Sequence, residues 1–123
     1  ICRYETTLIN NLTEGLDLLE RVGAENMGSI PDTFHMNIEE PIIEDSIRAC
    51  GDRIFHFHVS DSNRWYPGAG HLDFCSMLDS LYATDYDVYV PGEFMPLPDA
   101  DTSARQGIAY LRSVPGSWAG PGV

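Results

Sequence analysis

Carboxylate and imidazole side chains stand near the ends of short apolar segments along this chain of 123 residues. They are Glu5, Asp32, His35, His58 and Glu93, with Arg64 a few residues after His58. In parallel α/β structures the carboxyl ends of the strands meet at one face, so we expect these side chains to converge there. Carboxylate oxygens and imidazole nitrogens suit Mn²⁺, Mg²⁺, Co²⁺ or Zn²⁺. The residues alone therefore predict a divalent metal site at the mouth of an α/β fold.

Several of these features also have a purely structural interpretation. Asp32 could simply begin a turn or cap a helix. His56 and His58 lie two residues apart, on one face of a strand, so one of them could be a buried core histidine. Gly68 and Gly70 form a G-x-G, but without a third glycine or a following lysine this is a weak phosphate-binding pattern. These alternatives stay open on the residues alone.

The elements that must position these side chains follow from hydrophobic spacing. Apolar residues at intervals of three and four, with capping residues at the ends, predict four helices. The first passes through Leu8, Leu12, Leu16 and Leu19 and ends at Gly23; the second runs from about Pro41 to Gly51; the third begins at Asp73; and the fourth covers 101–112 and buries Ala104, Ile108 and Leu111.

Four short apolar segments lie before and between these helices, at residues 1–4, 27–34, 54–59 and 86–90. Segments that are apolar on both faces and alternate with helices are typical of parallel βα units. The expected fold is α/β, with about four βα units over residues 1–114 and a flexible tail over 115–123. Four units make half of an eight-fold barrel, and we interpret them as the C-terminal half of a (β/α)₈ TIM barrel. A small open α/β sheet is the alternative.

The charge of the chain limits the partners it can have. Its 19 Asp and Glu residues are opposed by seven arginines and no lysine, which gives a net charge of −12. Binding to nucleic acid or to an anionic membrane would act against that field, and no apolar run is long enough to span a membrane. Three cysteines without a C-x-x-C spacing predict neither a disulfide framework nor a zinc knuckle. We therefore expect a cytoplasmic protein with reduced thiols.

Two longer motifs carry a family resemblance. DTFHMNIEE (32–40) and HFHVSDSNRWYPGAGHLDF (56–74) resemble the sugar phosphate isomerase/epimerase family, which has the xylose isomerase-like barrel. Within that family the similarity is greatest to ketose 3-epimerases of the D-tagatose and D-psicose type. RYE at residues 3–5 and the segment that contains Glu93 follow in the same order, so the resemblance extends from Ile1 to about Val114.

The resemblance implies a metal held by two Glu, one Asp and one His. Asp32, His58 and Glu93 match three of these ligands, and Mn²⁺ is the expected ion. The other Glu opens the pattern E-x-x-N-R-[YF]-E and would lie two residues before Ile1, outside this chain. Cys2 stands where the family has Asn.

The resemblance also implies a reaction, the C3 epimerisation of a ketose or keto-sugar acid through an enediolate. The metal would act as a Lewis acid, while two glutamates on opposite faces of the sugar would remove and return the proton. Glu93 is the catalytic glutamate that this chain contains. Glu5, His35 and Arg64 match residues that hydrogen-bond the O1 and O2 end of the sugar.

Two other functions remain alternatives to an isomerase. The absent glutamate, together with Pro31 and Pro91 in expected interior strands, is compatible with a non-catalytic remnant that binds sugar or assembles with a partner. Metal-dependent abasic-site endonucleases share the barrel class, but the net charge of −12 disfavours a nucleic-acid substrate. Because a half barrel has open strand edges, we expect association with a missing N-terminal half or with a second copy.

Overall fold

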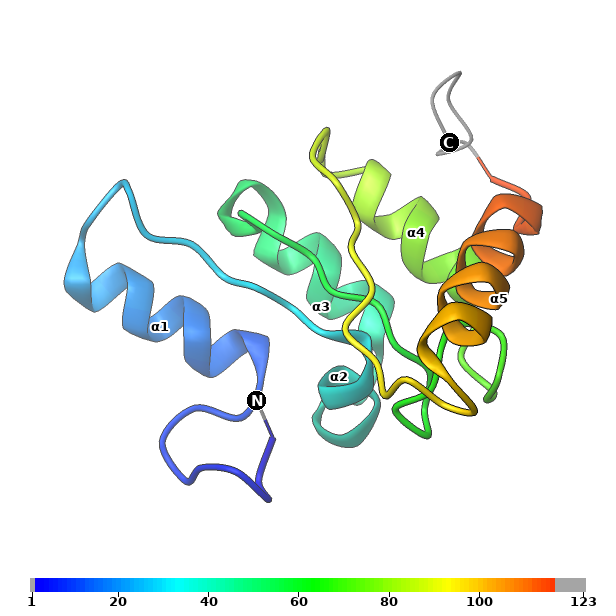
Figure 1. Ribbon diagram of the computed structural model, residues 1–123. Coiled ribbons are helices and arrows are strands. Elements are labelled where there is room, and N and C mark those ends of the chain that lie inside the picture. Colours follow the sequence, from blue (N-terminus) through cyan, green and yellow to red (C-terminus); the bar gives the residue numbers. More distant parts are fainter. Residues whose placement is uncertain (1, 117–123) are drawn as a thin grey trace.

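The computed structural model describes residues 2–116, and the regular elements of this part of the chain are helices (Figure 1). In chain order they are α1 (Leu12–Val22), α2 (Thr33–Glu39), α3 (Ile43–Cys50), the 3₁₀ helix η1 (Gly51–Arg53), α4 (Phe74–Tyr82) and α5 (Ala100–Ser113). Figure 1 shows α1, α3, α4 and α5 following one another in chain order across the molecule. None of the helices in the described range is long and apolar enough to cross a membrane. Most of the expected flexible tail lies outside the described residues.

Local capping sets where the helices begin and end. The helix predicted to pass through Leu8 begins later, at Leu12, because the Asn11 side chain caps its first turn. It ends as expected at Gly23, whose φ is +66°. The Asp73 carboxylate caps α4 as predicted, since it accepts the N–H groups of residues 75 and 76. Helix α3 begins two residues after Pro41. All four predicted helices are therefore present.

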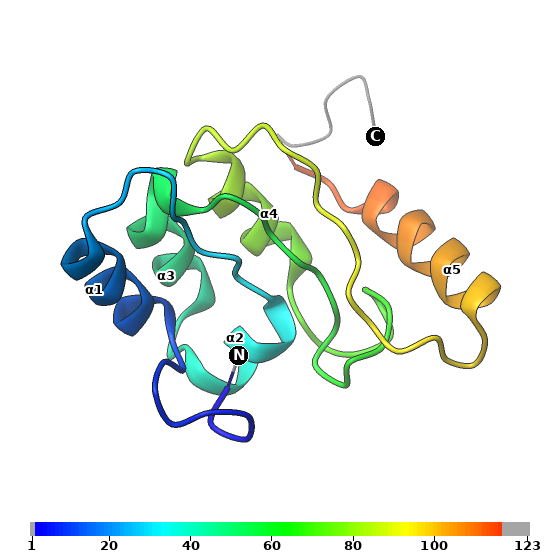
Figure 2. The ribbon, with the colours of Figure 1, turned by 60° about the vertical axis from the view of Figure 1, so that its left-hand side comes forward.

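Three extended segments lie beside the helices and pair in parallel (Figure 2). The pairing consists of isolated bridges, Ser29↔Ile54, Asp32↔His58 and Val59↔Gly92. The parallel order of the three central segments is thus confirmed. The prediction of regular strands at 27–34, 54–59 and 86–90 is wrong, because no continuous ladder forms among the described residues.

Pro31 lies where the first ladder is interrupted. Between the first two bridges one segment advances three residues, from 29 to 32, while the other advances four, from 54 to 58. The segment from 54 to 58 therefore contains one residue more than the segment it pairs with, as in a β-bulge. Pro31 has no N–H to donate, but its carbonyl accepts from His58 N at 2.9 Å, and the Pro91 carbonyl accepts from Val59 N at 3.0 Å. Both prolines thus take part in the pairing through their carbonyl groups only.

Two of the expected strand segments have a different structure. The described residues of segment 1–4 lie in a turn, in which Glu5 N–H donates to the Cys2 carbonyl at 2.9 Å. Segment 27–34 ends in the first turn of α2, a helix that hydrophobic spacing did not predict. The cause is Asp32, whose carboxylate accepts the N–H groups of residues 34 and 35 and so begins the helix.

The buried face of helix α5 is not the one that the sequence predicted. Ser103 and Gly107 are buried, whereas Ala104 and Ile108 are exposed. A Cβ at position 107 would lie 3.3 Å from the side chain of residue 66, so this contact has room only for small residues. Leu111 packs against the core, as predicted.

The core lies between the extended segments and the helices α3 and α4. Phe57 and Val59 are fully buried and pack with apolar residues of the two helices, Ile47, Phe74, Met77, Leu78 and Leu81. Successive residues of an extended chain point to opposite faces. His58, between Phe57 and Val59, therefore points away from the helices, toward the other side of the paired segments.

Candidate metal centre

Asp32, His58 and Glu93 come together at the end of the paired segments. One ligand atom from each residue lies within 4.8 Å of the other two. The parallel pairing explains this arrangement: Asp32 bridges His58, and Glu93 N–H donates to the Val59 carbonyl at 3.0 Å. The structure thus makes neighbours of three residues that are 26 to 61 positions apart in the sequence.

Asp32 is both a helix cap and a member of this cluster. Its side chain is 5% exposed, and its Oδ1 accepts from Phe34 N at 2.9 Å and from His35 N at 3.4 Å. The capping interpretation of Asp32 is confirmed, and it is compatible with the metal interpretation because capping uses one oxygen. The cap fixes the direction of the carboxyl group, which is what a metal ligand requires.

Burial sets the charge state of the cluster. Burial, together with the hydrogen bond between Asp32 and Glu93, raises the pKa of Asp32 to about 6. The same hydrogen bond lowers the pKa of Glu93, so Glu93 is the first of the two to ionise. Two carboxylates this close repel each other, and a divalent cation relieves that repulsion. The donor set of two carboxylates and one imidazole therefore fits a hard or borderline divalent ion.

Glu93 is held in place but remains accessible. His58 Nδ1 lies 2.7 Å from Glu93 Oε2, and Arg64 Nη2 lies 3.4 Å from the same oxygen. The Glu93 side chain is nevertheless 51% exposed. An ionised carboxylate that is fixed on one side and open on the other can accept a proton from a bound molecule.

Arg64 connects the metal ligands to His35. Its Nη1 lies 3.2 Å from both carboxylate oxygens of Asp32 and 3.2 Å from His35 Nε2. The guanidinium also lies over the Phe34 ring, 4.9 Å from its centroid. Arg64 has a φ of +64°, a left-handed conformation that a non-glycine residue rarely adopts. The loop that carries Arg64 must therefore hold this conformation in place.

Asp61 organises that loop. It is 1% exposed, and its carboxylate accepts the backbone N–H groups of Ser62 at 2.7 Å, Gly68 at 2.8 Å and Leu72 at 3.2 Å. A Cβ at Gly70 would lie 2.1 Å from Asp61 Oδ1, so only glycine fits there. Sequence reasoning missed Asp61; the glycine-rich run that follows it was the signal that a backbone must approach a side chain closely.

The contacts of Asp61 predict a component of acid sensitivity. Burial by itself would raise the pKa of Asp61, but hydrogen bonds from four backbone N–H groups outweigh it and hold the pKa below its ordinary value of 3.8. A carboxyl group with a lowered folded pKa stabilises the fold above its unfolded pKa, and that stabilisation is lost as pH falls through the folded pKa. As the pH is lowered below 3.8, we therefore expect the free energy of unfolding to decrease more steeply in the parent than in Asp61→Asn. Urea unfolding over a pH series measures both slopes, and equal slopes would contradict the prediction.

The remaining predicted residues also reach the site. Glu5 Oε1 lies 3.8 Å from His35 Nε2, so Glu5, His35 and Arg64 form a continuous polar group beside the metal ligands. His35 lies on α2 and is 8% exposed. All six residues that the sequence singled out are thus gathered in one place.

The other polar residues of the motifs have mainly structural contacts. His56 contacts the His58 ring edge to face, with centroids 5.0 Å apart, and is only partly buried. Gly68 has a φ of +95° and, like Gly70, serves the turn around Asp61. The G-x-G of this chain is therefore accounted for by loop geometry.

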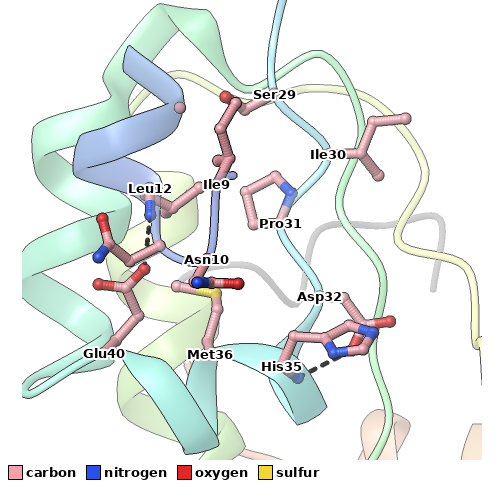
Figure 3. Close-up of a pocket in the computed structure, with 12 residues that line it drawn as sticks. Ile9, Asn10, Leu12, Ser29, Ile30, Pro31, Asp32, His35, Met36 and Glu40 are labelled. Atoms are coloured by element: carbon pink, nitrogen blue, oxygen red, sulfur yellow. Dashed lines mark hydrogen bonds between the residues drawn. The ribbon is translucent and has the colours of Figure 1, made fainter. Parts of the chain in front are cut away.

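A small cavity of about 150 Å³ adjoins the site between the start of α1 and the segment before α2 (Figure 3). Asp32 and His35 lie together at one side of it, and Glu40 accepts from Leu12 N at 2.8 Å at the other. Asn10 Oδ1 is buried here and has no hydrogen-bond partner among the described residues. The cavity thus offers an acceptor to a small polar molecule, such as water, next to the metal ligands.

Comparisons with known proteins find relatives among sugar epimerases. L-ribulose 3-epimerase of Methylomonas sp. (strain DH-1) is 43% identical over 84 residues, which cover 68% of this chain and 29% of that protein. The 3-dehydro-D-guloside 4-epimerase of Escherichia coli K12 is 31% identical over 112 residues, which cover 90% of this chain and 43% of that protein. The chain therefore spans less than half the length of these relatives.

Solved structures and family models lead to the same result. The crystal structure of D-psicose 3-epimerase from Clostridium cellulolyticum H10 with D-tagatose matches with a TM-score of 0.83 and 30% identity, over 93% of this chain and 47% of that one. The family model described as xylose isomerase-like TIM barrel matches residues 1–114. The chain belongs to the xylose isomerase-like TIM barrel family.

Proposed function

We propose that this chain is the C-terminal half of a metal-dependent sugar epimerase, which inverts C3 of a ketose or keto-sugar acid. The observation that carries the proposal is the convergence of Asp32, His58 and Glu93 beside Arg64 and His35. The relatives reported above are sugar 3- and 4-epimerases, which favours this function over an abasic-site endonuclease. The decisive experiment follows the exchange of the sugar's C3 proton with solvent.

Asp32, His58 and Glu93 would hold the ion, and Mn²⁺ is the ion we propose. When bound, a divalent cation supplies Lewis-acid stabilisation of the negative charge that develops as the proton leaves carbon. Three protein ligands lie in this chain, and we propose that the first Glu of the family pattern, before Ile1, is the fourth.

Glu93 is the proposed proton carrier. Its carboxylate lies against His58 and Arg64, and such partners favour the ionised form, which is the form that can accept a proton. His58 and Arg64 fix Oε2, which leaves Oε1 to face the substrate. A second acid–base group on the opposite face of the sugar, outside this chain, would return the proton.

Glu5, His35 and Arg64 are the proposed substrate-binding residues. Arg64 Nη1 donates toward Asp32 and lies next to His35 Nε2, so a sugar oxygen placed beside this pair would meet a cationic donor and an imidazole. The Glu5 side chain is 54% exposed and can accept from a sugar hydroxyl. Together they would orient the carbonyl end of the sugar, and so place the adjacent carbon against Glu93.

Asp32→Asn should separate the metal role of Asp32 from its capping role. Asparagine caps helices as well as aspartate does, so α2 should form, but the ligand loses its charge. We expect the variant to bind Mn²⁺ at least about tenfold more weakly than the parent, which itself binds weakly without the fourth ligand. Titration calorimetry compares them, with Asp17→Asn on the exposed face of α1 as the matched control. Equal Mn²⁺ affinities of Asp32→Asn and the parent would show that Asp32 is not a metal ligand.

We propose that the chain pairs with the other half of a barrel or with a second copy. The extended segments carry apolar side chains that are exposed in the described structure, Ile30, Phe55, Val88 and Tyr89. Open segment edges that carry such residues favour association. Light scattering of the purified chain should therefore detect species larger than a monomer. A sharp, stably folded monomer would count against the pairing.

We further propose a cytoplasmic location. The support is that Cys2, Cys50 and Cys75 are all free thiols in the structure. Reduced cysteines persist in that compartment, whereas oxidising compartments favour disulfides.

A further inference from the structure

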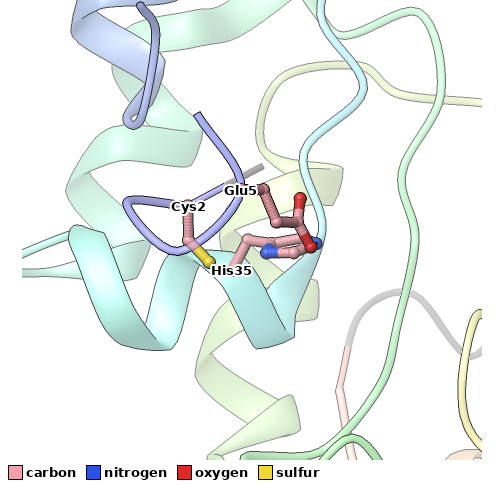
Figure 4. A group of neighbouring side chains, drawn as sticks. All are labelled: Cys2, Glu5 and His35. Carbon is pink, nitrogen blue, oxygen red and sulfur yellow. The ribbon is translucent and has the colours of Figure 1, made fainter. Parts of the chain in front are cut away.

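A second group of metal-ligating side chains lies beside the first, on the N-terminal turn. Cys2, Glu5 and His35 each place one ligand atom within 4.8 Å of the other two (Figure 4). The turn accounts for the first two, since Glu5 N–H donates to the Cys2 carbonyl and brings both side chains to α2. Figure 4 shows the His35 ring between the Cys2 thiol and the Glu5 carboxylate. This group shares no residue with the cluster of Asp32, His58 and Glu93.

An ion pair fixes the turn against α2. The Arg3 guanidinium donates to both oxygens of Glu39, with Nε–Oε1 at 3.0 Å and Nη2–Oε2 at 2.8 Å. His35 and Glu39 are four residues apart, so they lie on the same face of α2. The bidentate contact of Arg3 therefore docks the turn on the helix face that carries His35.

His35 carries a buried nitrogen that lacks a partner. The residue is 8% exposed, and Nδ1 makes no hydrogen bond in the described structure. Nε2 is the nitrogen that faces Arg64, at 3.2 Å, and Glu5, at 3.8 Å. A buried polar atom without a partner is unfavourable, and a bound ligand removes that cost.

We propose that Cys2, Glu5 and His35 bind a thiophilic divalent cation such as Zn²⁺. A cysteine thiolate and a carboxylate carry two negative charges, and sulfur, nitrogen and oxygen together form a donor set that zinc accepts. Cys2 is 2% exposed and anchors the site, while the half-exposed Glu5 provides the entrance and can move to close it. On binding, the Cys2 proton is released to solvent, and His35 binds the ion through Nδ1. The ring proton then lies on Nε2, which gives up its contact with Arg64 Nη1 and donates toward the Glu5 carboxylate instead.

The consequence of this site rests on the proposed function. An ion held by Glu5 and His35 would occupy two of the three proposed substrate-binding residues and so compete with the sugar. The site depends on Cys2, because neither Glu5 nor His35 can provide a thiolate. Loss of the Cys2 thiol should therefore remove the competition between the ion and the sugar.

Co²⁺ tests the site, because a cobalt–thiolate bond gives a near-ultraviolet charge-transfer band that oxygen and nitrogen ligands do not give. We expect the band when Co²⁺ is added to the 123-residue chain, its loss in Cys2→Ser, and an affinity at least about tenfold lower in His35→Ala. Cys75→Ser is the matched control and should keep the band, since Cys75 belongs to neither ligand group.

Two outcomes would overturn the proposal: no band in the parent chain, or a band that survives in Cys2→Ser. Neither outcome bears on the epimerase proposal, because Mn²⁺ binding at Asp32 is measured separately. If the chain shows the band but a protein that joins it to the rest of the barrel does not exchange the sugar proton, the second site is retained and the proposed reaction is refuted. Zn²⁺ should suppress the band by displacing Co²⁺, which confirms that both ions use one site.

Discussion

Replacing Glu93 by Gln, in a protein that joins this chain to the rest of the barrel, is expected to lower C3 proton exchange about a thousandfold or more. Gln has nearly the volume of Glu, so the fold should persist, but the amide can neither accept the proton nor contribute charge to the metal site. His58 and Arg64 would also lose the ionised oxygen that they now contact. The exchange rate is measured by the loss of deuterium from a C3-labelled ketose.

Two comparisons make the Glu93 result specific. Glu20→Gln removes the same charge from the exposed face of α1 and should exchange at the parental rate. Circular dichroism of Glu93→Gln should match the parent, which separates lost chemistry from lost structure. Exchange at the parental rate in Glu93→Gln would show that another group moves the proton. A parent that binds metal but never exchanges the proton would instead support a non-catalytic sugar-binding protein.

Asp61→Asn should both destabilise the chain and weaken sugar binding, although Asp61 lies outside the proposed substrate contacts. The amide nitrogen of asparagine is a donor, and it would face backbone N–H donors of Gly68 or Leu72. Loss of buried hydrogen bonds of this kind costs about 1–3 kcal/mol. Because the same loop holds Arg64 at a positive φ, we expect KM to rise by about tenfold or more, with a smaller effect on kcat.

The control for Asp61→Asn is Asp73→Asn, at the end of the same loop. Asp73 caps α4, and asparagine caps equally well, so that variant should unfold at nearly the parental urea concentration. Urea unfolding and steady-state kinetics give the two readouts. If Asp61→Asn lost stability but kept the parental KM, Asp61 would support the fold without positioning Arg64.

Sequence reasoning located the candidate site because its residues are marked by local patterns. Asp32, His58 and Glu93 each follow an apolar segment, and segments of this kind end at the same edge when they pair in parallel. The helices were predictable for a similar reason, since capping residues such as Asp73 and Gly23 act within one turn. Features that depend on neighbouring residues were thus available from the sequence.

The parts that sequence reasoning missed depend on contacts between distant residues. The buried face of α5 is set by the close approach of the loop around residue 66, which hydrophobic spacing alone does not record. Asp61 looks like a surface carboxylate in the sequence, and only the folded loop brings to it the backbone N–H groups of residues 62, 68, 70 and 72. The interruption at Pro31 shifts the pairing by one residue, and no local pattern predicts where that shift falls.

The extra residue opposite Pro31 reverses the faces to which the side chains of the rest of segment 54–59 point. Ile54 is buried, and after the slip Phe57 and Val59 are the buried residues, so the inward positions change from even to odd numbers. Without that change Phe57 would face the mouth and His58 would face the core. Regular pairing of the undeleted segment would thus put a phenyl ring in the place of a metal ligand, whereas deletion of residue 55 or 56 would remove the extra residue and keep His58 at the mouth.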